Sequence, residues 1–416
     1  MDTCNEKFLK ILKSALLGEN ASGCDGISPG EWLRLFHLAG AHSVLPMFYE
    51  AVHAVPALQE VNAPFIVDVR RQTMQMVMAQ TMRTNEFLGL NKQLQEAGVH
   101  PLVVKGIICR NLYPKPDFRQ SSDEDLLIPE EQFDICHGIM TDYGLQTTDD
   151  IATAASSYEI SYRKVRPPLY IELHKHLFPP ESEAYGDLNR FFDLAFERAI
   201  VEDIQGSPVR TLGYTDHLFY LICHAFKHFL HSGFGIRQVC DLVLFANRYG
   251  TQIDWAEVLD NCCKINAERF AAALFRIGSN YLVFDPEKAQ YPDLWRRIEV
   301  DETALLEDLL SSGVYGSSNL SRTHSSNITL GAVAAQKNGK REKNPICSSL
   351  FPPARKLAGS YPYLKKHPYL LPVAWCQRIR NYSRETRQTV GNTAASAVKI
   401  GKDRINLMKE YGILKK

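Results

Sequence analysis

The sequence predicts an α+β fold in which a small mixed β-sheet packs against helices from both ends of the chain. Apolar residues recur at helical spacing over roughly the first 100 residues and again from about residue 214 onward. Between these regions, short runs rich in β-branched residues alternate with short helical stretches, which is typical of a small sheet covered by helices. Charge is balanced, with 47 Lys and Arg against 47 Asp and Glu, so the whole chain has no electrostatic bias toward one kind of partner.

The first 80 residues are expected to form an N-terminal helical region. Phe8, Ile11 and Leu12 lie at helical spacing, and Ser28 followed by Pro29 is typical of a helix start. The predicted helices cover residues 6–17, 28–42 and 65–98.

Residues 81–213 are expected to contain the sheet. Four short runs have the length and the composition of strands, and the third alternates Tyr158, Ile160 and Tyr162 with period two. A helix is expected where Pro129 is followed by acidic residues and the apolar pattern stops at Gly144. The predicted strands cover residues 100–106, 123–128, 157–165 and 168–178, and the predicted helices cover 107–113 and 129–144.

The C-terminal half is expected to be helical again, with one interruption. A helical domain is predicted over residues 214–310, where Asp254 and Glu257 form the capping box of one helix. Residues 311–345 are rich in Ser, Asn, Gly and Lys and are predicted to form a mobile loop. Residues 346–416 are predicted to form a basic, helical C-terminal tail.

The end of the chain is basic although the whole chain is not. This asymmetry fits a solvated helix face or a surface for an anionic partner such as nucleic acid or anionic lipid. After Gln336 the only carboxylates are those of Glu342, Glu385, Asp403 and Glu410.

The sequence also favours one cellular environment. No apolar run approaches the roughly 20 residues of a membrane helix, and the N-terminal residues do not resemble a secretory signal, so no membrane span is expected. The 10 cysteines include no CxxC pair, which favours reduced thiols and a cytoplasmic location.

Two carboxylates stand at the beginning of a buried run, in "DEDLLI". Asp123 and Asp125 are two residues apart, so on a strand they project to the same face, and Glu124 projects to the other. Adjacent carboxylates repel, and a divalent cation removes that repulsion; Mg²⁺ is commonly held by one or two carboxylates together with phosphate oxygens. Exposed acids at a strand end remain the alternative interpretation of this motif.

Neighbouring residues strengthen the interpretation as a site for a nucleotide and a metal ion. Lys105 and Gly106 lie where a strand turns into a short helix, whose N-terminal N–H groups suit an anion. Arg119 offers a bidentate phosphate contact, and Ser122 is assigned to the nucleotide with it. Glu172 on a neighbouring strand supplies a third carboxylate.

The order "KG … LYPKPDFRQSSDEDLLI … YIELHKHLF" resembles the uncharacterised nucleotidyltransferase family of the polymerase-β-like superfamily. The later strings "HLFYLICHAFKH" and "IRQVCDL" are similar to the helices that follow in such proteins, and the resemblance covers most of residues 30–280. The sequence departs from the superfamily in having Lys-Gly in place of a Gly-Ser turn. It also has Glu124 where an aliphatic residue is usual.

The resemblance implies roles for the residues at the matching positions. Asp123 and Asp125 would bind two Mg²⁺ ions, and Glu172 would be the third acid, which brings up or deprotonates an acceptor hydroxyl. Lys105 and Gly106 would hold the triphosphate of the nucleotide.

The histidines of the helical domain share one helix face. They are interpreted as packed or solvated side chains, as a zinc pair, or as one wall of an acceptor cleft. His217, His224, His228 and His231 form this stripe. In the third interpretation, the acceptor cleft is lined by His174, His224, His228, Arg237 and Asp241. Arg237 and Asp241 form either an ion pair or a functional pair.

These observations predict a transferase that moves a nucleoside monophosphate group from a nucleoside triphosphate to a hydroxyl group, with release of pyrophosphate. ATP is the default donor, and the acceptor is a small molecule, a polysaccharide precursor or a protein. The alternative is a nucleotide-binding regulatory protein without catalysis.

Overall fold

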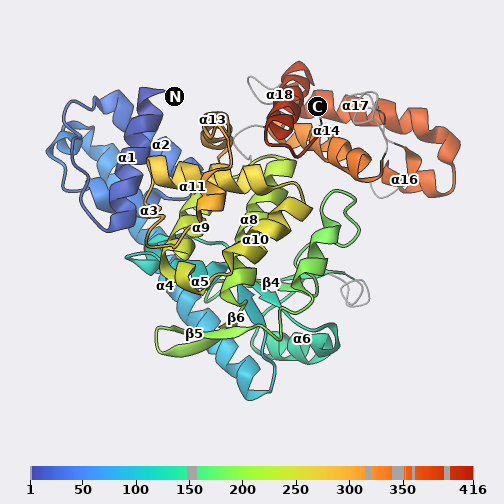
Figure 1. The fold of residues 1–416 in the computed structure, drawn as a ribbon, viewed down its shortest axis with the longest axis horizontal. Coiled ribbons are helices and arrows are strands. Elements are labelled where there is room, and N and C mark those ends of the chain that lie inside the picture. Colours follow the sequence, from blue (N-terminus) through green and yellow to red (C-terminus); the bar gives the residue numbers. More distant parts are fainter. Residues whose placement is uncertain are drawn as a thin grey trace.

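The computed structural model describes residues 2–147, 157–313, 320–339, 351, 353–357, 361–387 and 394–415. It confirms the α+β class: a mixed six-stranded sheet lies low in the molecule in Figure 1, with helices α8, α9 and α10 above it. Among the described residues, no helix combines the length and the apolarity needed to cross a bilayer.

The N-terminal helices follow from their capping residues and apolar faces. The carboxylate of Asp2 accepts the N–H of Cys4 at the first helix, and Ser28 and Glu31 form a complete capping box at the second. The fourth helix runs unbroken across the expected boundary at residues 80 and 81. The elements are α1 Thr3–Leu17, α2 Pro29–Ala41, α3 Leu45–Val52, η1 Pro56–Glu60 and α4 Ala63–Glu96.

The sheet contains the four predicted strands and one hairpin that the sequence analysis missed. Its order is β3-β4-β2-β1-β6-β5, with β2 parallel to β4 and β1 antiparallel to β2. The strands are β1 Leu102–Val104, β2 Glu124–Leu127, β3 Glu159–Lys164, β4 Leu169–His174, β5 Ile200–Ile204 and β6 Ser207–Thr211. Between and after them lie α5 Gly106–Arg110, η2 Pro116–Phe118, η3 Glu130–Gln132, α6 Phe133–Asp142 and η4 Gly186–Phe192.

The missed hairpin has a weak strand signature. Its first strand carries Glu202 and Asp203, and its second contains Pro208, and residues of these types are depleted in strands. The two strands are joined by a tight turn. Gln205 and Gly206 both have positive φ, at 54° and 81°, as in a two-residue hairpin turn.

Alternating residues of the central strands enter different cores. Val103 and Leu126 pack on one side of the sheet with Phe87 of α4 and Met140 of α6. Val104 and Leu127 belong to a larger core that the N-terminal helices share with α8 and the helices after it. The aliphatic run after Asp125 is therefore buried on both faces, and it fixes the register of β2.

Residues 214–312 are mainly helical. They contain α8 Tyr214–His231, α9 Ile236–Tyr249, η5 Gly250–Gln252, α10 Trp255–Lys264, α11 Glu268–Tyr281, α12 Asp293–Arg296 and α13 Thr303–Ser312.

The mobile loop predicted over residues 311–345 is wrong for much of its length, because α14 spans Leu320–Lys337. Ile328 and Val333 are buried, and the Thr329 hydroxyl donates to the carbonyl of Leu230 on α8 at 2.6 Å. Packing against α8 and α18 thus overrides a composition that favours a loop. The rest of that prediction, over residues 314–319 and 340–345, lies outside the described residues.

The C-terminal tail is helical where it is described. Its elements are α16 Ala354–Leu357, η7 Pro362–Lys365, η8 Pro368–Leu370, α17 Leu371–Arg387 and α18 Ala394–Glu410. In Figure 1, α16 and α17 project from the body of the molecule at the upper right.

Candidate functional site

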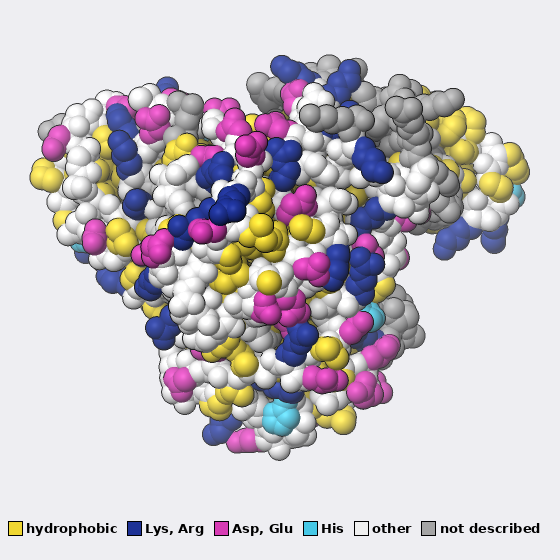
Figure 2. Space-filling model, viewed as in Figure 1, with side chains coloured by type: hydrophobic (Ala, Val, Ile, Leu, Met, Phe, Trp, Pro, Cys, Tyr) yellow, Lys and Arg dark blue, Asp and Glu magenta, His cyan; other side chains and the backbone are white. Residues whose placement is uncertain are grey.

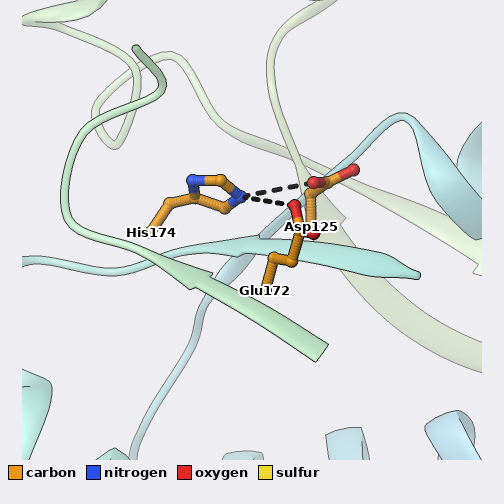
Figure 3. A group of neighbouring side chains, drawn as sticks. All are labelled: Asp125, Glu172 and His174. Carbon is orange, nitrogen blue, oxygen red and sulfur yellow. Dashed lines mark hydrogen bonds and ion pairs between the residues drawn. The ribbon is translucent and has the colours of Figure 1, made fainter. Parts of the chain in front are cut away.

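Three potential metal ligands converge where two parallel strands lie side by side. The register pairs Asp125 on β2 with Glu172 on β4, and His174 lies two residues further along β4, on the same face as Glu172. One ligand atom from each of the three residues lies within 4.8 Å of the others, and Figure 3 shows the side chains pointing toward one another. His174 Nε2 is 3.2 Å from Asp125 Oδ1 and 3.8 Å from Glu172 Oε2.

Asp125 is the buried, ionised carboxylate of this cluster. Burial alone would raise its pKa, but the ammonium of Lys105 and the hydrogen bond with His174 outweigh burial and hold the pKa well below its usual range. Lys105 Nζ lies 3.1 Å from Asp125 Oδ2. The negative charge of Asp125 is therefore already balanced within the protein.

Glu172 has the opposite electrostatic environment. Burial, followed by the negative charges of Asp125, Asp123 and Glu159, raises the pKa of Glu172 to about 8. Its side chain is 24% exposed, compared with 5% for Asp125. This crowding of carboxylates is the kind of unbalanced charge that a divalent cation relieves.

Asp123 is only partly brought into this arrangement. It precedes β2, is half-buried, and accepts a hydrogen bond of 3.2 Å from the hydroxyl of the exposed Ser122. It contributes to the raised pKa of Glu172 but does not belong to the cluster of three converging ligands. His174, expected only at an acceptor cleft, takes the third position instead.

Glu124 faces away from the cluster and has its own partners. Its carboxylate forms a buried ion pair with Arg110 and accepts the N–H of Ile107 at 2.8 Å. A Cβ at position 106 would lie 2.0 Å from Glu124 Oε2, so any larger residue here would have to displace this carboxylate. The expectation that the helix start at Gly106 is open to phosphate therefore needs correction, because a carboxylate of the protein caps it.

Lys105 is held in an unusual backbone conformation at the site. Its φ is 61°, which is rare outside glycine, and its N–H donates to Nε2 of His217 at 3.2 Å. Burial lowers the pKa of His217 to about 3, so this imidazole is neutral and can accept. The other ring nitrogen of His217 lies 3.3 Å from the hydroxyl of Thr211 on β6. The sequence does not indicate this contact, because Thr211 lies in the hairpin whose strand signature is weak.

His217, His224 and His228 of the α8 stripe lie toward Lys105, whereas His231 Nε2 lies 2.6 Å from the Tyr185 hydroxyl. His224 Nε2 lies 3.1 Å from Lys105 Nζ and 3.3 Å from His228 Nε2, and its other ring nitrogen lies 3.3 Å from Oε1 of Gln238. Burial, together with Lys105 and neighbouring basic groups, holds the pKa values of His224 and His228 well below the usual range. These imidazoles form a neutral wall beside the lysine.

Arg119 and Asp241 are structural partners, which corrects their expected contacts with phosphate and acceptor. Arg119 is buried; its Nε and Nη2 donate to the two carboxylate oxygens of Asp241 at 3.0 and 2.6 Å. The hydroxyl of Tyr113 donates to the same carboxylate at 2.7 Å. Arg237, the predicted partner of Asp241, donates to the backbone carbonyl of Gln120. These contacts tie the segment before β2 to α9.

The fold and the site define an α+β protein with a carboxylate and histidine cluster suited to a divalent cation. The model of a family described as uncharacterised nucleotidyltransferase matches residues 28–282, and the chain belongs to this family. The resemblance seen over residues 30–280 is thereby confirmed, and the family assigns the protein to nucleotidyl transfer in general terms. Neither the curated proteins nor the solved structures include a match to this chain.

Proposed function

We propose that this protein is a cytoplasmic, polymerase-β-like nucleotidyltransferase. It depends on Mg²⁺ and transfers the monophosphate group of a nucleoside triphosphate, ATP by default, to a hydroxyl group. The observation that carries the proposal is the convergence of Asp125, Glu172 and His174 at the paired strands β2 and β4. Membership of a nucleotidyltransferase family supports the same chemistry.

The donor atoms of the cluster fit a divalent cation. Asp125 and Glu172 offer the carboxylate oxygens that Mg²⁺ prefers, and His174 adds a nitrogen that Mn²⁺ and Zn²⁺ accept more readily. A second ion, as the family resemblance implies, would need Asp123 as an additional ligand. When bound, the cation lowers the pKa of an attacking hydroxyl and offsets negative charge on phosphate oxygens.

The side chains around the cluster have complementary tasks in this reaction. Asp125 stays ionised and fixes the position of Lys105, whose ammonium offsets charge on the triphosphate. The acceptor oxygen bonds to the α-phosphorus as the bond between that phosphorus and the bridging oxygen breaks, and pyrophosphate leaves with the bonding electrons. Glu172, ionised when the cation is bound, takes the hydroxyl proton.

The acceptor is expected to approach from the side of α8. His224 and His228 lie on this side beside Lys105 as neutral imidazoles. Small molecules, polysaccharide precursors and protein side chains all carry such hydroxyl groups, and the described contacts favour none of these three classes.

One contact favours the second candidate, a nucleotide-binding regulator without catalysis. The ammonium of Lys105, 3.1 Å from Asp125, already balances the charge of that carboxylate without a metal ion. A protein that binds nucleotide through Lys105 alone would keep this pair intact and would not need the cation.

Labelled nucleoside triphosphates distinguish the two candidates. The protein is incubated with each labelled triphosphate, Mg²⁺ or Mn²⁺ and a cell extract, beside the Asp125→Asn variant. Metal-dependent transfer of label by the unmutated protein alone is the expected result. Binding of nucleotide without transfer under all these conditions favours the regulator, and failure to bind any nucleotide contradicts both candidates.

A further inference from the structure

The segment 351–387, called here the C-terminal arm, has a small core of its own. Leu357, Leu364 and Ala374 are buried together, separately from the two large cores of the body. The aromatic ring of Phe351 packs edge-on against Trp375 of α17, with 5.2 Å between the ring centroids. The described side chains of the arm therefore pack together as a local unit.

Bulky apolar side chains point outward from this unit. Tyr369 is 73% exposed, Val373 is 47% exposed and Phe351 is 46% exposed. Tyr369 and Val373 lie four residues apart across consecutive helical turns, η8 and the start of α17, so they share one face. Figure 2 shows hydrophobic side chains gathered on the arm, with basic side chains beside them at its lower edge.

Over residues 351–384, the charge of the arm has a single sign. No Asp or Glu occurs in the sequence between Glu342 and Glu385. Lys365 and Lys366 are both exposed and lie directly before the turn that presents Tyr369. A polyanionic surface is therefore the electrostatic complement of this segment.

We propose that the C-terminal arm binds the surface of a lipid bilayer that contains anionic headgroups. Tyr369, Val373 and Phe351 enter the interfacial layer, and Lys365 and Lys366 contact the headgroups. Aromatic and aliphatic side chains beside lysines suit this layer, since the rings accept both apolar and hydrated surroundings while the ammonium groups remain in water. Nucleic acid would match the lysines, but it offers no apolar layer for the aliphatic Val373. The surface is separate from the candidate site, so this proposal does not depend on the proposed function.

Co-sedimentation with vesicles tests the proposal on the full chain. The protein is mixed with vesicles of phosphatidylcholine alone or of phosphatidylcholine with phosphatidylserine, and the pelleted fraction is measured. Binding to the anionic vesicles alone is expected. The variants Lys365→Glu/Lys366→Glu and Tyr369→Ser/Val373→Ser should each weaken that binding by roughly tenfold or more.

Matched substitutions on α4 control for general effects of charge and apolarity. Lys92→Glu changes a lysine that is 75% exposed, and Met78→Ser removes an apolar side chain that is 63% exposed. Both should leave vesicle binding unchanged, and all variants should keep the thermal unfolding midpoint of the unmutated protein. Failure of the unmutated protein to bind anionic vesicles overturns the proposal. Equal losses in the arm and α4 variants also overturn it, as does binding of single-stranded RNA by the arm without binding of vesicles.

Discussion

Glu124 and Asp125 are consecutive buried carboxylates of β2 that project to opposite faces of the sheet. Glu124 meets a guanidinium and a backbone N–H, and these partners close the start of α5. Asp125 meets Lys105 and His174, but the next carboxylate on its face, Glu172, is left among negative charges and has a pKa raised to about 8. On the first face, groups of the protein balance the charge of Glu124. On the second face, negative charge remains that an external cation would balance.

Whether a carboxylate has a matching counter-charge distinguishes structural ion pairs from a candidate site better than burial does. Arg119 and Asp241 resemble Glu124 and Arg110: both pairs are almost fully buried, and their charges match one to one. A strongly buried ion pair is thus no evidence of function here. The unmatched carboxylate, although more exposed, is the stronger indication of a ligand.

The largest effect is expected from removing the charge of Asp125. Asp125→Asn should lower nucleotidyl transfer by at least about 10³-fold, because a metal ligand and the anchor of Lys105 are lost together. The midpoint of chemical denaturation should change less than in Asp241→Asn, since Glu172 can ionise and take over the pairing with Lys105. Transfer rates and denaturation curves of the two variants check both parts. Unchanged transfer by Asp125→Asn would show that Asp125 does not take part in the reaction.

A large loss of stability is expected from the complete pairs. Asp241→Asn should lower the free energy of unfolding by about 3–5 kcal/mol, because it leaves Arg119 buried without its counter-charge. Glu287→Gln is the matched control: it breaks the exposed pair with Arg296, and a much smaller change is expected. Urea denaturation measures both. Equal effects would mean that burial of the first pair does not matter.

The sequence predicted one of these faces much better than the other. The pairing of Asp125 with Glu172 could be expected, since both lie on predicted strands whose side chains alternate with period two. The same period of two also places His174 on the face of Glu172, although His174 was predicted to line the acceptor cleft and not to bind the metal ion. The partners of Glu124 and Arg119 could not be predicted: they depend on side chains reaching from a helix turn 14 residues away and from α9, 122 residues away. Local periodicity does not encode such contacts.

A smaller loss of stability is expected from adding a side chain at position 106, beside the Glu124 carboxylate. Gly106→Ala should cost about 2 kcal/mol of unfolding free energy, because its Cβ would meet Glu124 Oε2 at 2.0 Å and this buried carboxylate would have to shift from its partners. Gly138→Ala, within α6, should be neutral or slightly stabilising, because a Cβ at position 138 would meet no described atom within 4 Å. Thermal unfolding of the two variants compares them. A neutral Gly106→Ala would show that the cap of α5 is loose rather than closed.

The last prediction concerns the change of stability with pH. The pKa of Glu172 in the folded protein, about 8, exceeds its ordinary value of 4.5, so folding favours the protonated form. That stabilisation is complete below pH 4.5 and is lost as the pH rises through 8. Without divalent ions, the free energy of unfolding should therefore fall by about 3 kcal/mol between pH 5 and 8 relative to Glu172→Gln. Parallel pH profiles of the two proteins would contradict the crowding of charge around Glu172.

Anomalous X-ray diffraction from crystals soaked in Mn²⁺ tests the central contrast most directly, because it locates the cation without relying on an acceptor. A peak is expected within ligand distance of the Asp125 and Glu172 carboxylates, and none beside Glu124. The peak should disappear in Asp125→Asn and persist in the Gly138→Ala control. The account is contradicted if Mn²⁺ leaves the Asp125 face empty in well-ordered crystals, or if it binds at Glu124 instead.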